Sequence, residues 1–181
     1  MSHPLLGFPP HQRRRLFGWA LGLTIIAAVT LQVMNGPLKT TAAPYGIVSF
    51  ELARTPTRTA AILQSWDVRA HLYAAFGLGF DYLFMVAYTS AIALAALAVR
   101  EGTSPWMARL GMAVAWAIGL AGLADAVENA LLWRLLLQMA PPTYPSWAWL
   151  AATIKFTIIT LALLYLLAAY VVRLRARGRG R

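Results

Sequence analysis

Residues 107–137 read MARLGMAVAWAIGLAGLADAVENALLWRLLL. This run is longer than the roughly 20 apolar residues that an α-helix needs to cross a bilayer, yet its second half carries two acids, Asp125 and Glu128. An uncompensated charge at the centre of a spanning helix costs about 2.5–3.5 kcal/mol. The stretch therefore predicts a membrane helix whose carboxylates are paired, protonated, hydrated or bound to a ligand.

Three further apolar runs are long enough to cross a bilayer, at about 16–34, 72–99 and 147–172. With 107–137 they predict an all-α polytopic membrane protein, a four-transmembrane-helix bundle. The composition agrees, because 60% of the residues are hydrophobic and only 12% are charged, which is far from the balance of a soluble domain. The first run is also longer than the about 7–15 apolar residues of a signal-peptide core, so we expect it to be retained.

The segment 38–70, between the first two spans, is too polar to cross a membrane but carries several apolar and aromatic side chains. Thr55-Pro56 should interrupt a helix here and suits the start of a new one. We expect two short helices, about 45–54 and 56–66, lying on the outer face of the membrane. A structured loop that caps the bundle is the alternative.

The net charge of +10 gathers at the chain ends. Residues 1–15 form a basic leader and 173–181 an Arg/Gly tail, on either side of a transmembrane domain, 16–172. With the termini inside, ten Lys and Arg residues fall on the cytoplasmic side and five on the other. The positive-inside rule therefore predicts a multi-pass protein of the cell (inner) membrane with both termini cytoplasmic.

The same charge distribution bears on partners. The expected ones are the lipid bilayer and, at the basic termini, anionic lipid headgroups. Nucleic acid is disfavoured because the basic residues flank apolar spans instead of forming a separate patch. A second copy of the chain, or another subunit of a membrane complex, stays open as a partner.

Four charged side chains fall inside the predicted spans at similar depth, in the outer half of the bilayer: Asp81, Asp125, Glu128 and Lys155. Since a helix advances about 100° per residue, each lies on or beside a helix face rich in small residues, and such faces let membrane helices approach closely. We expect the four charges to converge inside the bundle, with Lys155 paired to at least one carboxylate. The faces combine Asp81 with Gly77 and Tyr88, Asp125 with Gly111, Gly122 and Asn129, and Lys155 with Ala148 and Ala162.

These four residues, with Tyr82 and Asn129 as hydrogen-bonding neighbours, form the candidate site. Three interpretations stay open: a polar network that only stabilises the bundle, a site for a ligand or substrate, and a relay for protons or ions. An oxygen cage for a hard cation is disfavoured, because the Lys155 ammonium would lie beside it. No metal site is predicted, and no cofactor can be assigned.

Candidate headgroup contacts lie in or just after the segment 38–70, at Glu51, Arg54, Arg58, Arg69 and His71. Glu51 is expected to pair with Arg54, three residues on, or otherwise to reach down to the intramembrane charges. The arginines face headgroups or receive the phosphate of a lipid. A lone histidine at the membrane edge, such as His71, is more often an interfacial or capping residue than a ligand.

Motifs of soluble enzymes are absent from the sequence. The chain has no cysteine, which excludes disulfides, thiolate metal sites and thiol nucleophiles. It has no phosphate-binding Gly loop, no G-x-S-x-G and no H-E-x-x-H. No catalytic residue can be named, and whether the chain is an enzyme stays open.

The predicted architecture has four helices, with Asp81, Asp125 and Glu128 inside the membrane. In this architecture alone, the chain resembles the sterol-isomerase and sigma-2-receptor group. In that group, acidic residues inside a four-helix cavity meet a cationic ligand or intermediate. No motif matches residue for residue, so the resemblance assigns no site. Our first hypothesis is a membrane protein that binds, or as an enzyme transforms, a lipid or small apolar ligand. The alternatives are a non-catalytic subunit or assembly factor, and an ion- or proton-coupled transporter.

Overall fold

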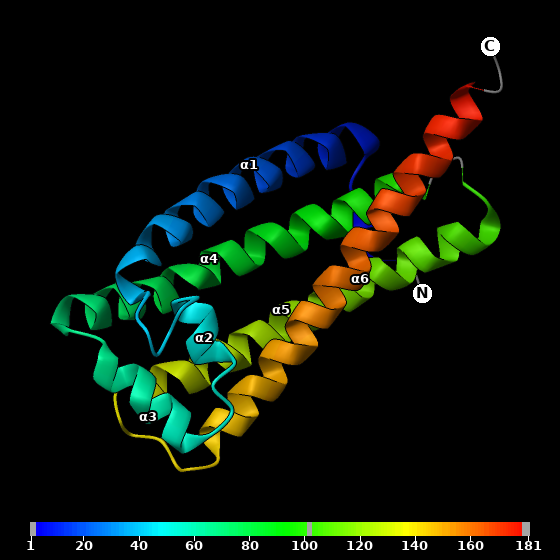
Figure 1. Cartoon of the computed structure of the whole chain (residues 1–181). Helices are drawn as coiled ribbons and strands as arrows, with labels where there is room; N and C mark the ends of the chain where they lie inside the picture. The colour runs from blue at the N-terminus through cyan, green and yellow to red at the C-terminus, as the bar shows by residue number, and fades with distance from the viewer. Residues whose placement is uncertain (1–2, 101–102, 179–181) are drawn as a thin grey trace.

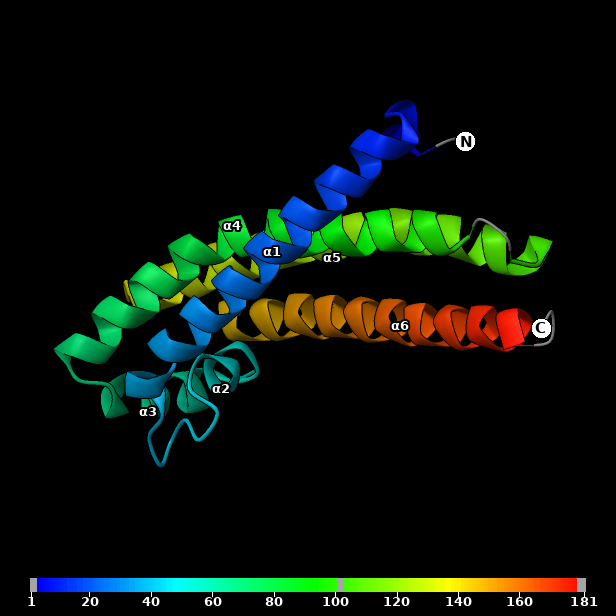
Figure 2. The same cartoon turned by 90° about the horizontal axis from the view of Figure 1, so that it is seen from above.

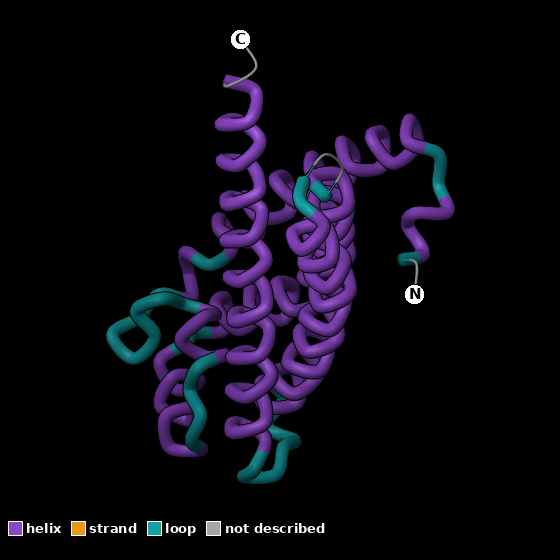
Figure 3. Tube along the Cα trace, turned by 90° about the vertical axis from the view of Figure 1, so that its right-hand side faces the viewer, coloured by secondary structure: helices purple, strands orange, loops and turns teal. Residues whose placement is uncertain are grey.

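The computed structural model describes residues 3–100 and 103–178, except the side chains of 176–178. All regular structure in these residues is helical, and they contain no strand (Figure 3). The elements are η1 (Pro4–Gly7), α1 (Pro10–Met34), η2 (Gly36–Leu38), α2 (Ile47–Glu51), α3 (Pro56–Ser65), α4 (Val68–Val99), α5 (Pro105–Leu136) and α6 (Tyr144–Gly178).

Four of the helices, α1, α4, α5 and α6, are long and apolar enough to cross a membrane. The predicted fold class is therefore confirmed. All four begin before the predicted spans, α1 at Pro10 and α4 at Val68. The reason is that apolar runs mark the part of a helix that suits hydrocarbon, whereas capping residues set its ends. At α4, the side chain of Asp67 accepts a hydrogen bond from the backbone N–H of Ala70 at 2.7 Å.

The two short helices of the segment 38–70 are present, and the break at Thr55-Pro56 is confirmed. Thr55 caps α3 by accepting a hydrogen bond from the N–H of Arg58 at 3.3 Å, and Pro56 occupies the first turn. The first of the two helices is shorter than predicted, since α2 ends at Glu51. Arg54 adopts a left-handed backbone conformation (φ 60°), which no right-handed helix can include.

The long helices are arranged as a three-helix unit with one added helix. In Figure 1, α4, α5 and α6 run beside one another, and α1 lies along α4. Figure 2 shows that α1 crosses α4 obliquely and that α2 and α3 cover the end of the bundle opposite the C-terminus. Only 6% of the most apolar stretch of α1 is buried, against 44% of the corresponding stretch of α4. α1 therefore packs along α4 and leaves most of its remaining surface exposed.

Two hydrophobic clusters fill the interior, one beneath α2 and α3 and one toward the chain termini. The first includes Leu78 of α4, Leu132 of α5 and Ala148 of α6. The second includes Met85, Ala121 and Ala162 of the same three helices. On every helix the candidate charged residues fall between these positions in sequence. The charges thus form a polar layer between two apolar cores.

Small residues bring the helices close together at two of the predicted positions, Gly111 and Gly122, but not at Gly77, where nothing lies within 4 Å of an added Cβ. Gly111 of α5 is the tightest case, because a Cβ there would overlap the hydroxyl of Tyr165 and lie 3.0 Å from the carbonyl oxygen of Ala96. At Gly122 a Cβ would lie 3.0 Å from the Thr89 side chain. These contacts fix the relative positions of α4, α5 and α6, and with them the polar layer.

Candidate functional site

Lys155 of α6 is the centre of the polar layer. Its Nζ atom lies 2.6 Å from Oε2 of Glu128 and 3.0 Å from Oδ1 of Asp125. The two acids are three residues apart on α5, so their side chains project from neighbouring parts of one helix surface. All three residues are buried, and Glu128 has no exposed surface at all. The expected pairing of Lys155 is therefore confirmed, with two carboxylates rather than one.

The second oxygen of Asp125 is held by a tyrosine. The hydroxyl of Tyr88 donates a hydrogen bond to Oδ2 at 2.9 Å. The structure does not bring Tyr82 into this cluster, since that residue is 44% exposed and its hydroxyl donates to the carbonyl oxygen of Ala126 at 3.3 Å. Tyr88 was not among the candidate site residues, although its position seven residues after Asp81 places it on the same helix face.

Asp81 joins the polar layer through an amide. The side-chain nitrogen of Asn129 donates to Oδ2 of Asp81 at 2.6 Å. Asn129 is one turn along α5 from Asp125, so the amide links the Asp81 carboxylate to the helix surface that carries Asp125 and Glu128. The predicted convergence holds for all four charges, but the partner of Asp81 is Asn129.

Glu51 also belongs to this group, as in the second of the two positions expected for it. Its carboxyl is buried, and Oε2 lies 4.0 Å from Nζ of Lys155. Glu51 therefore reaches down to the intramembrane charges instead of facing headgroups. Arg54, its predicted partner, lies over the ring of Trp149, with 4.5 Å from its guanidinium carbon to the ring centroid.

The reason for the position of Glu51 is the anchoring of α2. Asn35, at the end of α1, donates from Nδ2 to the carbonyl oxygen of Tyr45 at 3.2 Å. Its Oδ1 accepts from the N–H of Ile47 at 2.8 Å. Gly46, with φ 63°, allows the chain to pass against this amide, where any Cβ would collide with it. Sequence spacing gives no signal of such a loop contact.

Charge is not balanced in this cluster. Three carboxyls, those of Glu51, Asp125 and Glu128, lie within 4.0 Å of one ammonium, and the fourth, that of Asp81, is bound by Asn129. Oε2 of Glu51 and Oε1 of Glu128 are buried without a hydrogen-bond partner. Burial raises the pKa of the Glu51 carboxyl; Lys155 opposes the rise and Asp125 adds to it. Because buried unpaired charge is costly, the site as a whole favours additional protons or a bound cation.

A cavity of about 70 Å³ adjoins the cluster. One side of it is polar and consists of Glu51, Asp81 and Asn129. The cavity is small, so it suits a head group and not a whole lipid. The remaining lining is mostly apolar and comes mainly from α1, α4 and the segment between α1 and α2: Leu31, Met34, Asn35, Leu38, Ile47, Tyr73, Ala74, Gly77 and Leu78.

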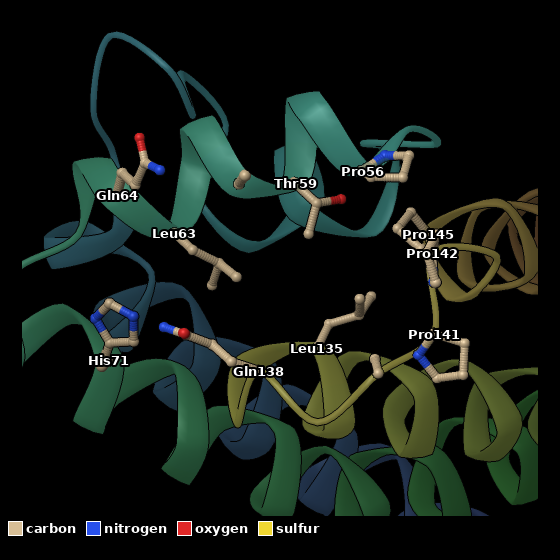
Figure 4. Close-up of a pocket in the computed structure, with 12 residues that line it drawn as sticks. Pro56, Thr59, Leu63, Gln64, His71, Leu135, Gln138, Pro141, Pro142 and Pro145 are labelled. Carbon is tan, nitrogen blue, oxygen red and sulfur yellow. The ribbon is translucent and has the colours of Figure 1, made fainter.

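A larger cavity, of about 390 Å³, lies between α3 and the loop that joins α5 to α6. It shares no lining residue with the smaller one. Figure 4 shows Gln64, His71 and Gln138 toward one end and prolines, among them Pro56 and Pro145, toward the other. His71 thus lies at this cavity and not in the charge cluster, and its Nδ1 is 2.9 Å from the carbonyl oxygen of Asp67.

The remaining headgroup candidates lie at the surface. Arg54, Arg58 and Arg69 are exposed, and the guanidinium carbon of Arg69 lies 5.5 Å from the centroid of the Tyr73 ring. Their contact with lipid stays a prediction. Across the described residues, no group of three or more His, Asp or Glu side chains is placed to hold a metal ion.

No protein-family model, curated protein or solved structure matches this chain. Fold and site together define its class. It is a membrane-like helical bundle with a buried cluster in which Lys155 forms salt bridges with Asp and Glu side chains.

Proposed function

We propose that this chain is an integral membrane protein that binds a small amphiphile with a cationic head group. The head would occupy the 70 Å³ cavity beside Glu51 and Asp81. The observation that carries the proposal is the ratio of four carboxyls to one ammonium at a cavity that is otherwise mostly apolar. A cation at this position would compensate charge that Lys155 alone leaves uncompensated.

The route of such a ligand follows from the packing of α1. This helix supplies Leu31 and Met34 to the cavity wall, and few of its residues are buried. We place the entry of an apolar ligand body between α1 and α4, from the bilayer. The ligand is consequently apolar along its length and charged at one end, which places it among lipids and small membrane-soluble molecules.

A second candidate function is that of a non-catalytic subunit of a membrane complex. The close pairing of Lys155 with Glu128 and Asp125, at 2.6 and 3.0 Å, favours it, because a purely structural network needs such contacts. In that case the exposed surface of α1 would contact a partner protein. Binding of an ammonium compound at the cavity distinguishes the two functions.

We further propose that both termini are cytoplasmic, which puts the cavity in the outer half of the cell membrane. The charge bias of the sequence supports this orientation. Single cysteines introduced at Ser2 and after Arg181 should react with a membrane-impermeant reagent only after the cells are opened. Labelling of either cysteine in intact cells contradicts the orientation.

The binding proposal is tested with decyltrimethylammonium, decanol and decyl sulfate, which share a chain length and differ in head charge. In an uncharged maltoside detergent, only the ammonium compound should raise the melting temperature, because only it compensates the carboxylates. Asp81→Asn should weaken its binding about tenfold, the equivalent of about 1.4 kcal/mol.

Asp67→Asn is the matched control, because asparagine caps α4 as well as aspartate does and Asp67 does not line the cavity. Equal stabilisation by all three compounds, or equal weakening by both variants, would refute a cation site. The subunit function would then be the better conclusion.

A further inference from the structure

We infer that Glu51 carries an exchangeable proton in the empty site and releases it when the cationic head binds. Ligand binding is then an exchange of one cation for one proton. This inference rests on the proposed function and deepens it, since it assigns one residue of the site a role in controlling occupancy.

The distances around Lys155 single out Glu51. The ammonium lies 2.6 Å from Glu128, 3.0 Å from Asp125 and 4.0 Å from Glu51. An ammonium has three donor hydrogens, and the two short contacts, with Glu128 and Asp125, engage two of them. Oε2 of Glu51 has no hydrogen-bond partner. Of the three carboxylates around Lys155, that of Glu51 is therefore the least compensated.

The other acids have closer partners than Glu51 has. Glu128 makes the shortest contact with Lys155, at 2.6 Å, although its Oε1 is buried without a hydrogen-bond partner. Asp125 accepts a second hydrogen bond, from Tyr88 at 2.9 Å. Asp81 accepts one from Asn129 at 2.6 Å. Donated hydrogen bonds favour the ionised form of a carboxyl. A proton that reduces the charge of the cluster is consequently held best at Glu51.

Glu51 also has access to the cavity, which the other two partners of Lys155 lack. It lines the cavity, whereas Asp125 and Glu128 do not. It belongs to α2, a helix of 5 residues that lies outside the four long helices and is followed at once by the exposed Leu52. A proton leaving Glu51 therefore has a path along α2 to the surface of the structure, without passing between the long helices.

Each element packed against Glu51 contributes to its surroundings. α6 presents Lys155, α5 presents Asp125 and Glu128, and α4 presents Asp81 and Tyr73, while the residues of α1 at the cavity are apolar. Only one of these groups is cationic. Burial, the largest influence on Glu51, raises its pKa and favours the protonated form in this setting.

The exchange is balanced in charge and atoms. The O–H bond of Glu51 breaks, the proton passes to water at the α2 end, and the electron pair stays on the carboxylate. The positive head group then takes the place of the proton beside that carboxylate. The net charge of the site is unchanged, so the cavity is never left with an additional buried anion.

Infrared spectroscopy of the full chain in maltoside, without ligand, tests the first half of the inference. The carbonyl stretching band of a protonated carboxylic acid should be present in the wild type and lost in Glu51→Gln. Asp67→Asn, which alters a carboxyl away from the cavity, should retain it. Absence of the band from the wild type, or its persistence in Glu51→Gln, overturns the inference whether or not any ligand binds.

Calorimetry with decyltrimethylammonium in buffers of different ionisation enthalpy tests the second half. This probe has a fixed charge and no proton of its own, so released protons come from the protein. One proton per bound ammonium is expected for the wild type and none for Glu51→Gln. Binding without proton release overturns the exchange. Failure of the ammonium to bind, with the infrared band present, instead refutes the proposed function and leaves the proton on Glu51.

Discussion

Two layers of the α4–α5–α6 unit accommodate buried polar groups in different ways. Near the chain termini, Tyr165 donates its hydroxyl to the carbonyl oxygen of Met107 at 3.1 Å, and Gly111 leaves room for the ring. At the level of Lys155, three carboxyls lie within 4.0 Å of one ammonium, a fourth is bound by Asn129, and buried carboxyl oxygens of Glu51 and Glu128 have no hydrogen-bond partner. The first layer satisfies its polar group and needs no ligand, whereas the second retains excess charge.

This difference between the two layers indicates where a functional site is to be sought in such a bundle. Burial of a polar group is by itself no sign of a site, because Tyr165 is fully explained by packing and one hydrogen bond. Excess charge is different, since close packing cannot reduce its cost. The variants below test whether the two layers differ in this way.

The largest effect is expected at the centre of the polar layer. Lys155→Met removes the one cation and leaves Asp125 and Glu128 uncompensated, which should lower the free energy of unfolding by about 3–5 kcal/mol. Thermal unfolding in maltoside measures this loss. Leu161→Met on the same helix is the control, because Leu161 is 60% exposed. Adding Asp125→Asn and Glu128→Gln to Lys155→Met should recover most of the loss.

The two tyrosines compare the layers directly. Tyr88→Phe removes a hydrogen bond to a carboxylate, for which about 1.5–3 kcal/mol is typical, whereas Tyr165→Phe removes one to a carbonyl, for which about 0.5–1.5 kcal/mol is typical. Tyr88→Phe should therefore lower the melting temperature more. Equal losses would show that the two layers do not differ in this way.

Gly111→Ala should disrupt the packing around Tyr165, near the chain termini, and leave the polar layer in place. The added methyl group would overlap the Tyr165 hydroxyl, and overpacking of this kind costs about 1–3 kcal/mol. Gly119→Ala, where nothing lies within 4 Å of the new Cβ, should be neutral or slightly stabilising. Decyltrimethylammonium binding by Gly111→Ala should equal that of the wild type.

The smallest effect is a pH dependence. Since the folded-state pKa of Glu51 is raised above its ordinary value of 4.5, the stability linked to its proton is fully present below pH 4.5 and is lost as the pH rises through the folded-state pKa. Melting temperatures across this range should fall more for the wild type than for Glu51→Gln. Parallel curves would contradict the assignment.

Much of this arrangement could be predicted from the sequence, and the reason is the regularity of helices. Spans of known rise and a fixed angle per residue place Asp125, Glu128 and Lys155 at similar depth and on inward faces. The same rule places Tyr88, and not Tyr82, on the face that carries Asp81. Small residues at Gly111 and Gly122 added the information that the faces touch.

Glu51 could not be placed in this way. Its position depends on Asn35, which binds the N–H of Ile47 twelve residues further along the chain, and on a loop whose path has no periodicity. The cavities depend on how side chains of three or more elements fill space, which no single helix pattern specifies. The features that could not be predicted are thus the path of the loops and the packing between elements, whereas the helices could be predicted.

The order of residues along the chain gives the Lys155 cluster a consequence for biosynthesis. A ribosome delivers Glu51 and Asp81 first, then Asp125 and Glu128, and Lys155 only with the last helix. Until α6 emerges, the central parts of a nascent α4–α5 hairpin hold three acids and no basic residue, each acid at about 2.5–3.5 kcal/mol on insertion scales if ionised. The hairpin must therefore enter the bilayer protonated or wait beside the insertion machinery. Its partition into lipid is completed by the helix that is made last.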